Sequence, residues 1–386
     1  LDIQIQELIN QRAAAAKEVA EIKLEEDRDA FFYRPEREAA ILKQIQRRNR
    51  GPMGDEEMAR LFREIMSACL ALEQPMQIAY LGPEGTFTQA AALKHFGHSI
   101  KTVSLASISD VFREVESGAA HYGVVPVENS TEGVINHTLD LFMHSPLFIC
   151  GEVSLRIHHH LLSRESDLEA VNRVYSHQQS LAQCRLWLDR NLPMAEQITV
   201  GSNAEAAKLA RQETGAAAIA GEMAAELYQL QGLARNIEDQ PDNTTRFLVI
   251  GRQKVYPSGE DKTTFLCATR NVAGGLNALL APLARHGISM SRIESRPSRQ
   301  GNWGYVFFID IDGHREDSDV AEAITEIGRA SAMDSHYLYY CKGAATAKYQ
   351  HKKMNLPAFP FHESVKPDAN HHRYARCQIN RPDKRN

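Results

Sequence analysis

Residues that form disulfides or metal centres are scarce in this sequence. Six Cys are scattered over 386 residues, with no Cys-x-x-Cys pair and no metal-ligand spacing. In a chain of this length, that pattern indicates reduced thiols and no metal site. Apolar runs long enough to span a membrane are also missing, and the first residues lack the basic-then-apolar order of a secretory signal. These absences predict a cytoplasmic protein with no membrane partner.

An excess of one charge sign is missing as well. Lys and Arg number 44 against 49 Asp and Glu, which gives a net charge of −5. This balance leaves no electrostatic footprint for nucleic acid, so we expect no nucleic-acid partner. The length predicts two or three domains. From changes in the residue pattern we expect domains at 1–75, 76–256 and 262–341, followed by an atypical tail at 342–386.

The first domain has the apolar spacing of amphipathic helices, which we expect at 1–23, 36–49 and 55–73. Residues 51–54, Gly-Pro-Met-Gly, break the chain between the second and third helices, and Asp55 is expected to cap the third. Three helices of this length bury only a thin core. We therefore expect an all-α bundle that forms a homodimer or a higher homo-oligomer.

Two cations stand on one face of the first helix. Arg12 and Lys23 are eleven residues apart, close to three full turns. They would hold a small dianion, or else lie as snorkelling cations beside a core. The segment resembles the all-helical chorismate mutases, in which two interlocked protomers form one bundle. The resemblance implies that Arg12 binds a substrate carboxylate, and that Lys23 binds the second carboxylate side and the ether oxygen.

The same resemblance extends the site to the other two helices. It implies that Glu38 binds the ring hydroxyl of chorismate and that Glu73 faces the ether oxygen. Arg37 and Cys69 fall beside or on further site positions. Chorismate rearrangement is pericyclic, so it needs no nucleophile and no cofactor. Holding the compact conformer and stabilising charge on the breaking C–O bond would supply the rate.

Two positions depart from these mutases. These mutases carry an Arg about one and a half turns upstream of the Arg12 position, and it reaches the site of the other protomer. This sequence begins too late to contain that Arg. Some members also have Gln where Glu73 stands. A Glu donates to the ether oxygen only when it is protonated. We therefore expect mutase activity to fall between roughly pH 6 and 9, unless burial raises the pKa of Glu73.

From Gln77 onward, strands alternate with helices. Ser or Thr stands three positions before Gln, Asp or Glu at 86–89, 107–110, 176–179 and 202–205, the capping-box arrangement that opens a helix. We also expect a helix from Ser130 through residue 142, a helix at 181–190 and a strand at 216–220. Repeated strand–turn–helix units predict an open α/β sheet with sites at the strand ends. The length of the region predicts two lobes with a cleft between them. The chain would cross to the second lobe near 154–160 and return before Thr244.

Three motifs stand at turns of this region. They are Gly82-Pro83-Glu84-Gly85-Thr86-Phe87-Thr88-Gln89, Val125-Pro126-Val127-Glu128-Asn129-Ser130-Thr131-Glu132-Gly133 and Asp242-Asn243-Thr244-Thr245-Arg246-Phe247. Together they resemble the signature set of the prephenate dehydratases, in which the Thr of Thr-Arg-Phe is the residue most tied to catalysis. The resemblance implies a two-lobed fold similar to periplasmic binding proteins.

Prephenate has two carboxylates and a ring hydroxyl that must leave. We expect Thr245 to donate a hydrogen bond or a proton to the departing oxygen, Arg246 to help hold the carboxylates, and Glu128 to support the hydroxyl end. Helix N-termini that face the cleft would bind the carboxylates; otherwise they are simply capped helices. The candidate groups are Gly82, Gly85 and Thr86, then Asn129, Ser130 and Thr131, and, from the second lobe, Ser176, His177 and Gln178.

Three consecutive histidines, His158 to His160, suggest a metal site at first sight. On a strand, His158 and His160 share one face and His159 takes the opposite one, so three ligands would not converge. A closed metal site also needs more ligands at suitable spacing. We therefore predict that these histidines pack at the lobe crossover.

The region 262–341 has the order βαββα, a ferredoxin-like α+β unit for which 336–341 would supply the last strand. Gly274-Gly275-Leu276 and Glu294-Ser295-Arg296-Pro297 resemble the two phenylalanine-binding motifs of the ACT domain in the dehydratases. Binding of phenylalanine between paired domains would then close the catalytic cleft. The alternative is an appendage that only dimerises. In 342–386 we expect disorder, with a basic interaction tail as the alternative.

Together, the three resemblances imply a bifunctional enzyme of phenylalanine biosynthesis. It would rearrange chorismate to prephenate and then decarboxylate and dehydrate prephenate to phenylpyruvate, with feedback inhibition by phenylalanine. Three alternatives remain open: a dehydratase with a degenerate mutase domain, a non-enzymatic amino-acid sensor, and an enzyme that takes arogenate.

Overall fold

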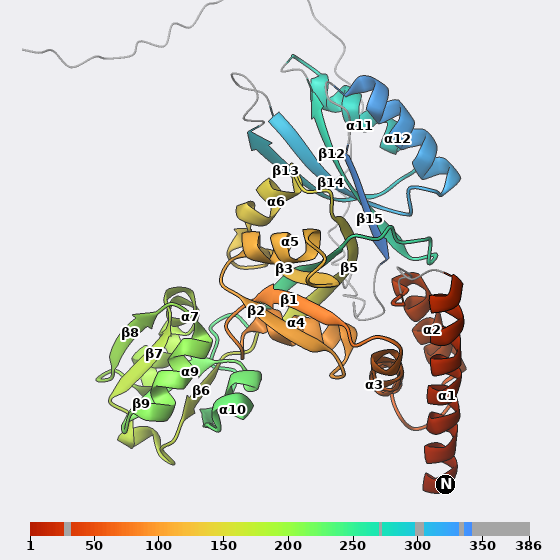
Figure 1. Ribbon diagram of the computed structural model, residues 1–386. Helices are drawn as coiled ribbons and strands as arrows, with labels where there is room; N and C mark the ends of the chain where they lie inside the picture. The colour runs from red at the N-terminus through yellow and green to blue at the C-terminus, as the bar shows by residue number, and fades with distance from the viewer. Residues whose placement is uncertain (27–31, 270–271, 298–304, 332–335, 342–386) are drawn as a thin grey trace, which may run out of the picture. The chain divides into compact units, whose positions relative to one another are not determined.

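A computed structural model describes residues 1–26, 32–269, 272–297, 305–331 and 336–341 (Figure 1). The tail for which we expected disorder lies outside these described residues. Among them, no helix is long and apolar enough to cross a membrane.

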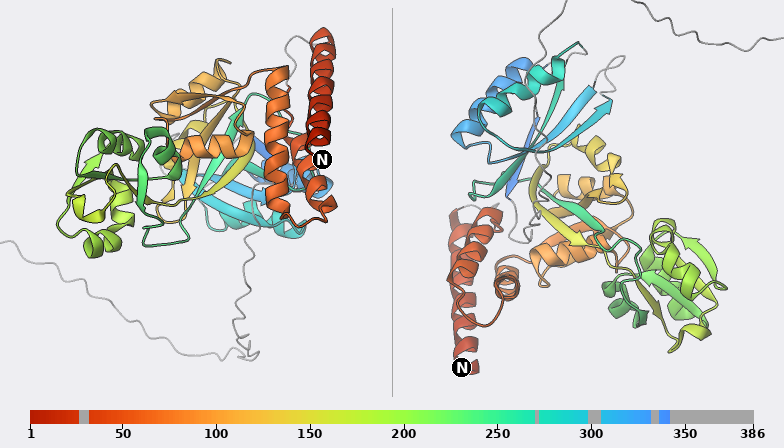
Figure 2. Two further views of the ribbon diagram at one scale, coloured as in Figure 1. Left: turned by 90° about the horizontal axis from the view of Figure 1, so that it is seen from below. Right: turned by 180° about the vertical axis from the view of Figure 1, so that it is seen from behind.

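The N-terminal region is helical, as predicted (Figure 2). Leu42, Ile45 and Met66 form the core that α2 and α3 share. Gly54 occupies the N-cap of α3, so the expectation that Asp55 caps it is wrong; Asp55 is the first helical residue and accepts a bond from Asn49 Nδ2 at 2.7 Å. The helices are α1 (Asp2–Glu26), α2 (Pro35–Arg48) and α3 (Asp55–Glu73).

The first α/β lobe contains a sheet with the order β5-β11-β3-β1-β2. β11 is antiparallel to both β3 and β5, whereas β1 and β2 continue the sheet in parallel. Ser107 caps α5 by accepting a bond from the Asp110 N–H, as predicted. The elements are β1 (Gln77–Leu81), α4 (Phe87–Phe96), β2 (Lys101–Leu105), α5 (Ile108–Glu116), β3 (Tyr122–Asn129), β4 (Gly133–Val134), α6 (Asn136–Phe142), β5 (Phe148–Arg156) and β11 (Thr244–Gly251).

The second lobe contains a separate sheet with the order β10-β6-β9-β7-β8. The chain enters it after Arg156 and returns at Thr244, close to the predicted crossings. Small Ala side chains from α9 and β9 fill much of its core. The elements are β6 (His160–Ser163), η1 (Leu168–Ala170), β7 (Arg173–His177), α7 (Gln178–Gln183), α8 (Arg185–Asn191), β8 (Glu196–Val200), α9 (Asn203–Gln212), β9 (Ala216–Ala220), α10 (Glu222–Tyr228) and β10 (Gln231–Ala234).

The last described region continues the sheet of the first lobe with strands in the order β13-β14-β12-β15, and β15 pairs in parallel with β5. β15 pairs antiparallel with β12, so the segment 336–341 does supply the final strand. Helices α11 and α12 pack side by side on one face of the sheet (Figure 1). The elements are β12 (Asp261–Thr269), α11 (Gly275–Arg285), β13 (Met290–Pro297), β14 (Tyr305–Asp312), α12 (Ser318–Ala330) and β15 (His336–Cys341).

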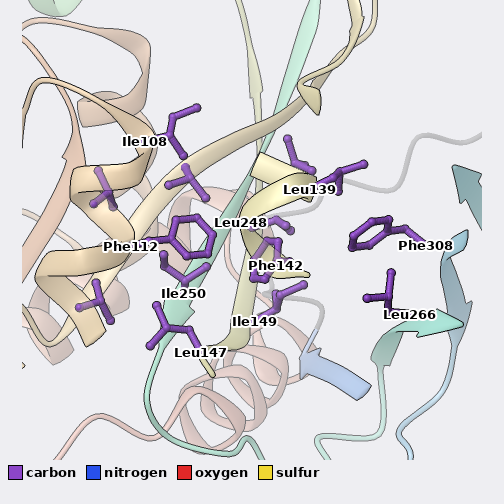
Figure 3. Packing of buried hydrophobic residues seen from close by; sticks show 14 of the residues in the cluster. Ile108, Phe112, Leu139, Phe142, Leu147, Ile149, Leu248, Ile250, Leu266 and Phe308 are labelled. Carbon is purple, nitrogen blue, oxygen red and sulfur yellow. The ribbon is translucent and has the colours of Figure 1, made fainter. Parts of the chain in front are cut away.

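The opposite face of this sheet contributes to the core of the first lobe. Leu266 of β12 and Phe308 of β14 belong to one buried cluster with Phe112 of α5 and Phe142 of α6 (Figure 3). Side chains alternate across a strand, so the residues between them point to α11 and α12 instead. β12 and β14 therefore each have one face on α11 and α12 and the other on the α/β lobe.

Candidate active sites

Thr245 lies at the start of β11, directly opposite Asn129 of β3 in the antiparallel ladder. Both side chains are buried, each with 9% of its surface exposed. The amide nitrogen of Asn129 donates to Thr245 Oγ1 at 2.8 Å. The predicted catalytic Thr is therefore held in a fixed position by a neighbouring strand, close to where the chain returns from the second lobe.

Arg246 and Glu128 project from the opposite face of these strands, because successive residues alternate. Arg246 Nη2 contacts Asp310 Oδ2 of β14 at 2.7 Å, and Arg292 Nε of β13 lies 3.4 Å from Glu128 Oε2. The expectation that Arg246 joins Thr245 around one acid is therefore wrong. Because of the same alternation, Glu128 lies on the face opposite Thr245, so the expectation that it supports the hydroxyl end of the substrate is also wrong.

The ion pairs that Arg246 makes on this face are buried. The side chains of Asp310 and Glu152 are 1% and 3% exposed, and Arg246 lies 3.5 Å from Glu152 through Nε. Lys262 of β12 also reaches Glu152, at 3.3 Å. Burial alone would raise the pKa of Asp310, but the guanidinium of Arg246 and the nearby Arg292 outweigh it, and the pKa is lowered. Asp310 is therefore an ionised partner of Arg246.

The first predicted carboxylate-binding group lies at the N-terminus of α4. Thr86 takes the N-cap position, but its hydroxyl donates to Leu81 O at 3.2 Å instead of capping the helix. Gln89 accepts the Gly85 N–H at 2.7 Å and not that of Thr86, so the capping box expected at Thr86 and Gln89 does not form. Gly85 has a φ of +85°, which favours glycine. Gly82 precedes a cis peptide bond to Pro83.

The second predicted group is not a helix N-terminus. Asn129 Oδ1 accepts the backbone N–H groups of Thr131 at 2.9 Å and Glu132 at 3.0 Å, which makes an Asx-type turn. Ser130 Oγ accepts the Thr244 N–H at 2.9 Å. The helix expected at Ser130 begins only at Asn136. The donors expected to bind a carboxylate are therefore used inside the turn, and this prediction is wrong.

The third predicted group is only partly available to a ligand. Ser176 is fully buried, and its hydroxyl bonds Ile219 O at 2.9 Å and Asn203 Oδ1 at 3.0 Å, so its assignment to the substrate is wrong. His177 is the N-cap of α7 and accepts the Gln179 N–H through Nδ1. Gln178 is the first residue of that helix.

Sequence reasoning missed a chain of amides between the two lobes. Asn243 Nδ2 donates to Gln183 Oε1 of α7 at 3.1 Å, and Gln183 Nε2 donates to Glu132 Oε1 at 3.2 Å. His159 Nε2 bonds the same Gln183 oxygen at 2.9 Å. Burial lowers the pKa of His159, which keeps the ring neutral. No motif surrounds Gln183, so the sequence does not point to it. Asn243 lies within the Asp-Asn-Thr-Thr-Arg-Phe motif and could have been selected on that ground.

The three histidines have separate partners, in keeping with the predicted packing at the crossover. His158 Nδ1 lies 2.8 Å from Glu238 Oε1, and His160 Nδ1 accepts the Asn236 N–H at 3.2 Å. Within the described ranges, no group of three or more His, Cys, Asp or Glu side chains is arranged to hold a metal ion.

The predicted mutase residues meet around Glu73 at the end of α3. Burial raises the pKa of Glu73, and the positive charges of Lys23, Arg12 and Arg37 oppose that rise. Because these charges come from α1 and α2, the three helices bring cations to one carboxyl group. Lys23 Nζ also lies 5.3 Å from the centre of the Phe32 ring. The arrangement suits a dianion held beside a protonated acid.

Glu38 occupies a second part of this region. Its side chain is 17% exposed and lies 3.5 Å from Arg63 Nε of α3, a residue that sequence reasoning did not select. Burial raises the pKa of Glu38 to about 7 against the opposing effect of Arg63. Cys69, one turn before Glu73 on α3, is 3% exposed. Burial therefore raises the pKa of both Glu38 and Glu73.

The two predicted effector motifs lie at the start of α11 and along β13. Gly274 is the N-cap of α11 with a φ of +79°, and Leu276 is 37% exposed. Glu294, Ser295 and Pro297 lie on β13. Arg296 bonds Asp140 Oδ1 of α6 through both Nε, at 2.9 Å, and Nη2, at 2.7 Å. In this structure the arginine of the second motif is therefore bound to the first α/β lobe.

Three family models match successive parts of the chain. Residues 1–74 match the family model for chorismate mutase type II, residues 78–255 that for prephenate dehydratase, and residues 263–329 that for the ACT domain. A bifunctional chorismate mutase/prephenate dehydratase from Stutzerimonas stutzeri is 57% identical over 332 residues, which cover 85% of this chain and 91% of that protein. The chain belongs to the bifunctional chorismate mutase/prephenate dehydratase family.

Solved structures resemble the dehydratase and ACT parts. A prephenate dehydratase from Arthrobacter aurescens in complex with L-Phe has 33% identity and a TM-score of 0.64, covering 70% of this chain and 91% of that one. GqqA, described as a quorum-quenching acylase, has 29% identity and the same TM-score, covering 69% of this chain and 98% of that one.

Proposed function

We propose that this protein catalyses two successive reactions, chorismate to prephenate on the N-terminal helices and prephenate to phenylpyruvate between the α/β lobes. The buried Thr245 hydroxyl, held by Asn129 at 2.8 Å, is the observation that carries the second activity. A non-enzymatic sensor has no need for a hydroxyl fixed in this way. A phenylalanine-binding ACT domain would add feedback inhibition.

In the dehydratase reaction, two bonds of prephenate break. The electron pair of the ring–carboxylate bond enters the ring as carbon dioxide leaves, and the C–O bond breaks with its pair as hydroxide departs. Formation of the aromatic ring drives the reaction, so the enzyme mainly needs to stabilise the leaving oxygen. Thr245 supplies that donor. Thr86 at the start of α4, with His177 and Gln178 at the start of α7, would hold the carboxylates from two lobes that close as in periplasmic binding proteins.

In the mutase reaction, Arg12 and Lys23 would hold the carboxylates of chorismate, and the protonated carboxyl of Glu73 would donate a hydrogen bond to the ether oxygen. Burial of Glu73 supports this role, because it raises the pKa of the carboxyl even though Lys23, Arg12 and Arg37 oppose that rise. Arg37, Glu38 and Cys69 would complete the site, with Glu38 accepting from the ring hydroxyl.

The two carboxyls predict opposite effects of pH on mutase activity. We expect the rate to rise as Glu38 ionises near pH 7, and to fall by up to about tenfold per pH unit as Glu73 loses its proton. Glu73→Gln, which donates at every pH, should remove the falling limb and leave the rising one. The measurement is the initial rate of chorismate loss against pH. Dehydratase activity of the same variant is the control, and identical profiles for both proteins would contradict the role of Glu73.

The contacts between β13, β14 and the first lobe support effector coupling. Arg292, Arg296 and Asp310 pair with Glu128, Asp140 and Arg246 respectively. Glu128 and Arg246 are chain neighbours of Asn129 and Thr245. A ligand that displaces β13 would therefore act on the two strands that carry the dehydratase site. Such coupling is reciprocal, so prephenate would also change phenylalanine binding.

The exposed apolar face of α1 supports a homodimer through the N-terminal helices. Ile5, Leu8 and Val19 share this face and are 55%, 64% and 40% exposed. An apolar stripe of this kind on a long helix fits a second copy of the same helix better than it fits water.

Steady-state assays of both reactions, each with and without phenylalanine, test the proposed function. We expect chorismate consumption, phenylpyruvate formation from prephenate, and inhibition of the second reaction by phenylalanine. Absence of phenylpyruvate would favour the sensor, and absence of the first reaction alone would favour a degenerate mutase domain. Arogenate in place of prephenate tests the remaining alternative.

A further inference from the structure

The side chain of Asn129 has its orientation fixed by the backbone around it. Its Oδ1 accepts two N–H groups, from Thr131 at 2.9 Å and from Glu132 at 3.0 Å. If the amide were turned over, Nδ2 would face these two donors and both bonds would be lost. The nitrogen of Asn129 must therefore point the other way, toward Asn243 and Thr245.

Both N–H bonds of that nitrogen are used. One goes to Asn243 Oδ1 at 2.8 Å and the other to Thr245 Oγ1 at 2.8 Å. Asn243 is oriented in turn, because its own Nδ2 donates to Gln183 Oε1. Gln183 is oriented by its Nε2, which donates to the carboxylate of Glu132. Every amide in the chain from Gln183 to Thr245 therefore has a defined direction.

This direction decides what the Thr245 hydroxyl does. A hydroxyl has one proton and can accept as well as donate. Asn129 is the hydrogen-bond partner of Thr245 Oγ1 among the residues that the structure describes, and Thr245 accepts in that bond. Its own proton is consequently left to donate to a substrate. An acceptor at the position of the Asn129 nitrogen would instead draw that proton inward.

We infer that Asn129 is a positioning residue for the dehydratase reaction, whose amide aims the Thr245 proton at the departing oxygen. This inference rests on the proposed function, since it assumes that Thr245 is the donor. It replaces the expectation that Asn129 binds a carboxylate of the substrate. It also gives the second lobe a part in the chemistry, because Gln183 of α7 fixes the far end of the amide chain.

Asn129→Asp tests the inference with a nearly isosteric change. One carboxylate oxygen still accepts from Thr131 and Glu132, while the other replaces the donor and accepts the Thr245 proton. We expect kcat for prephenate to fall by about 10²- to 10³-fold at neutral pH, with KM changed less than about threefold. As the pH falls and the introduced carboxylate becomes protonated, its O–H can donate to Thr245 again. The loss in kcat should then shrink, whereas the wild-type rate should show no such gain.

Asn243→Asp is the matched control. Asn243 Oδ1 and Thr245 Oγ1 each lie 2.8 Å from Asn129 Nδ2, so this variant places a carboxylate beside the same amide. The Asn129 amide can still donate to Thr245. We expect this variant to raise KM through weaker contact with Gln183, and to lack the acid recovery of kcat. Chorismate mutase activity of each variant reports an intact chain. Full dehydratase kcat in Asn129→Asp, or a loss that does not recover in acid while mutase activity persists, would overturn the inference. The same acid-recoverable loss in Asn243→Asp would also overturn it.

The two levels of the proposal can fail separately. An inactive Thr245→Ala combined with a fully active Asn129→Asp would leave Thr245 as the donor and remove the role of Asn129. An active Thr245→Ala would remove the donor itself.

Discussion

Replacing Thr245 with Ala should lower kcat for prephenate dehydration by about 10³-fold, because one positioned donor to a leaving oxygen contributes two to three orders of magnitude. The Thr245 hydroxyl is buried and accepts a hydrogen bond from Asn129. It lies at the start of β11, where the chain returns from the second lobe. Removing the hydroxyl and methyl groups of one side chain leaves the backbone ladder between β11, β3 and β5 in place. The defect should therefore appear in kcat, with chorismate mutase activity retained.

Thr244→Ala provides the control from the adjacent position. Its hydroxyl donates to Asp242 O at 3.3 Å, within the turn that precedes β11. The same atoms are removed one residue away, on a side chain with no part in the proposed site. We expect the rate of this variant to stay within about twofold of the wild type, since exposed turn contacts contribute little. Equal losses in the two variants would indicate that the turn matters and the Thr245 hydroxyl does not.

Replacing Asp310 with Asn should destabilise the protein by about 3 kcal/mol, because it leaves Arg246 with a weakened partner in a buried site. The side chain of Arg246 is 14% exposed and that of Asp310 is 1% exposed. We also expect phenylalanine to inhibit the variant about tenfold less effectively, since one link between β14 and the dehydratase strands is lost. Denaturant unfolding and the phenylalanine concentration for half inhibition measure the two effects.

A double-mutant cycle separates the ion pair from the two side chains. Combining Arg246→Met with Asp310→Asn should reveal a coupling energy of about 2 kcal/mol. The pair formed by Arg113 and Asp110 on α5 is a surface control, with side chains 73% and 32% exposed. Its coupling should stay below about 0.5 kcal/mol. Equal coupling in the two cycles would contradict a buried link between the domains.

The pH dependence of this stabilisation follows from the lowered pKa of Asp310. A carboxyl with a lower pKa in the folded state stabilises the protein above its unfolded pKa. That contribution is lost as the pH falls through the folded pKa. The difference between the wild type and Asp310→Asn should therefore be full at neutral pH and disappear in acid.

Regular elements with strong periodic patterns were predictable from the sequence. The bounds of α3 and β9 agree with those expected, and Ser202 caps α9 by accepting the Glu205 N–H, although the Glu205 side chain accepts from Gly201 and does not close the predicted box. The predicted helix over 181–190 is split into α7 and α8 at Cys184. The strands β2 and β10 were not predicted, because both are partly exposed and lack a continuous apolar run.

The site was predictable only in part, because motifs do not state which face of a strand each residue takes. Thr245 and Arg246 were assigned to one acid, although a strand that includes both must separate them. Treating the motif as a loop hid this consequence. The turn at Asn129 could not be inferred either, since a side chain that satisfies its own backbone looks like a helix cap in sequence. Contacts such as Gln183 with Asn243 depend on how distant segments meet.

Both faces of β11 are enclosed, and each belongs to a different core. Phe247 and Val249 lie in one buried cluster, while Leu248 and Ile250 lie in another. Deletion or insertion of a single residue within β11 would exchange these two sets of side chains between the cores. It would also turn the side chain of Thr245 away from the proposed substrate site. β11 can therefore accept substitutions more readily than insertions or deletions. Changes of length are better tolerated in the connecting turns, where they leave the alternation of side chains along the strand unchanged.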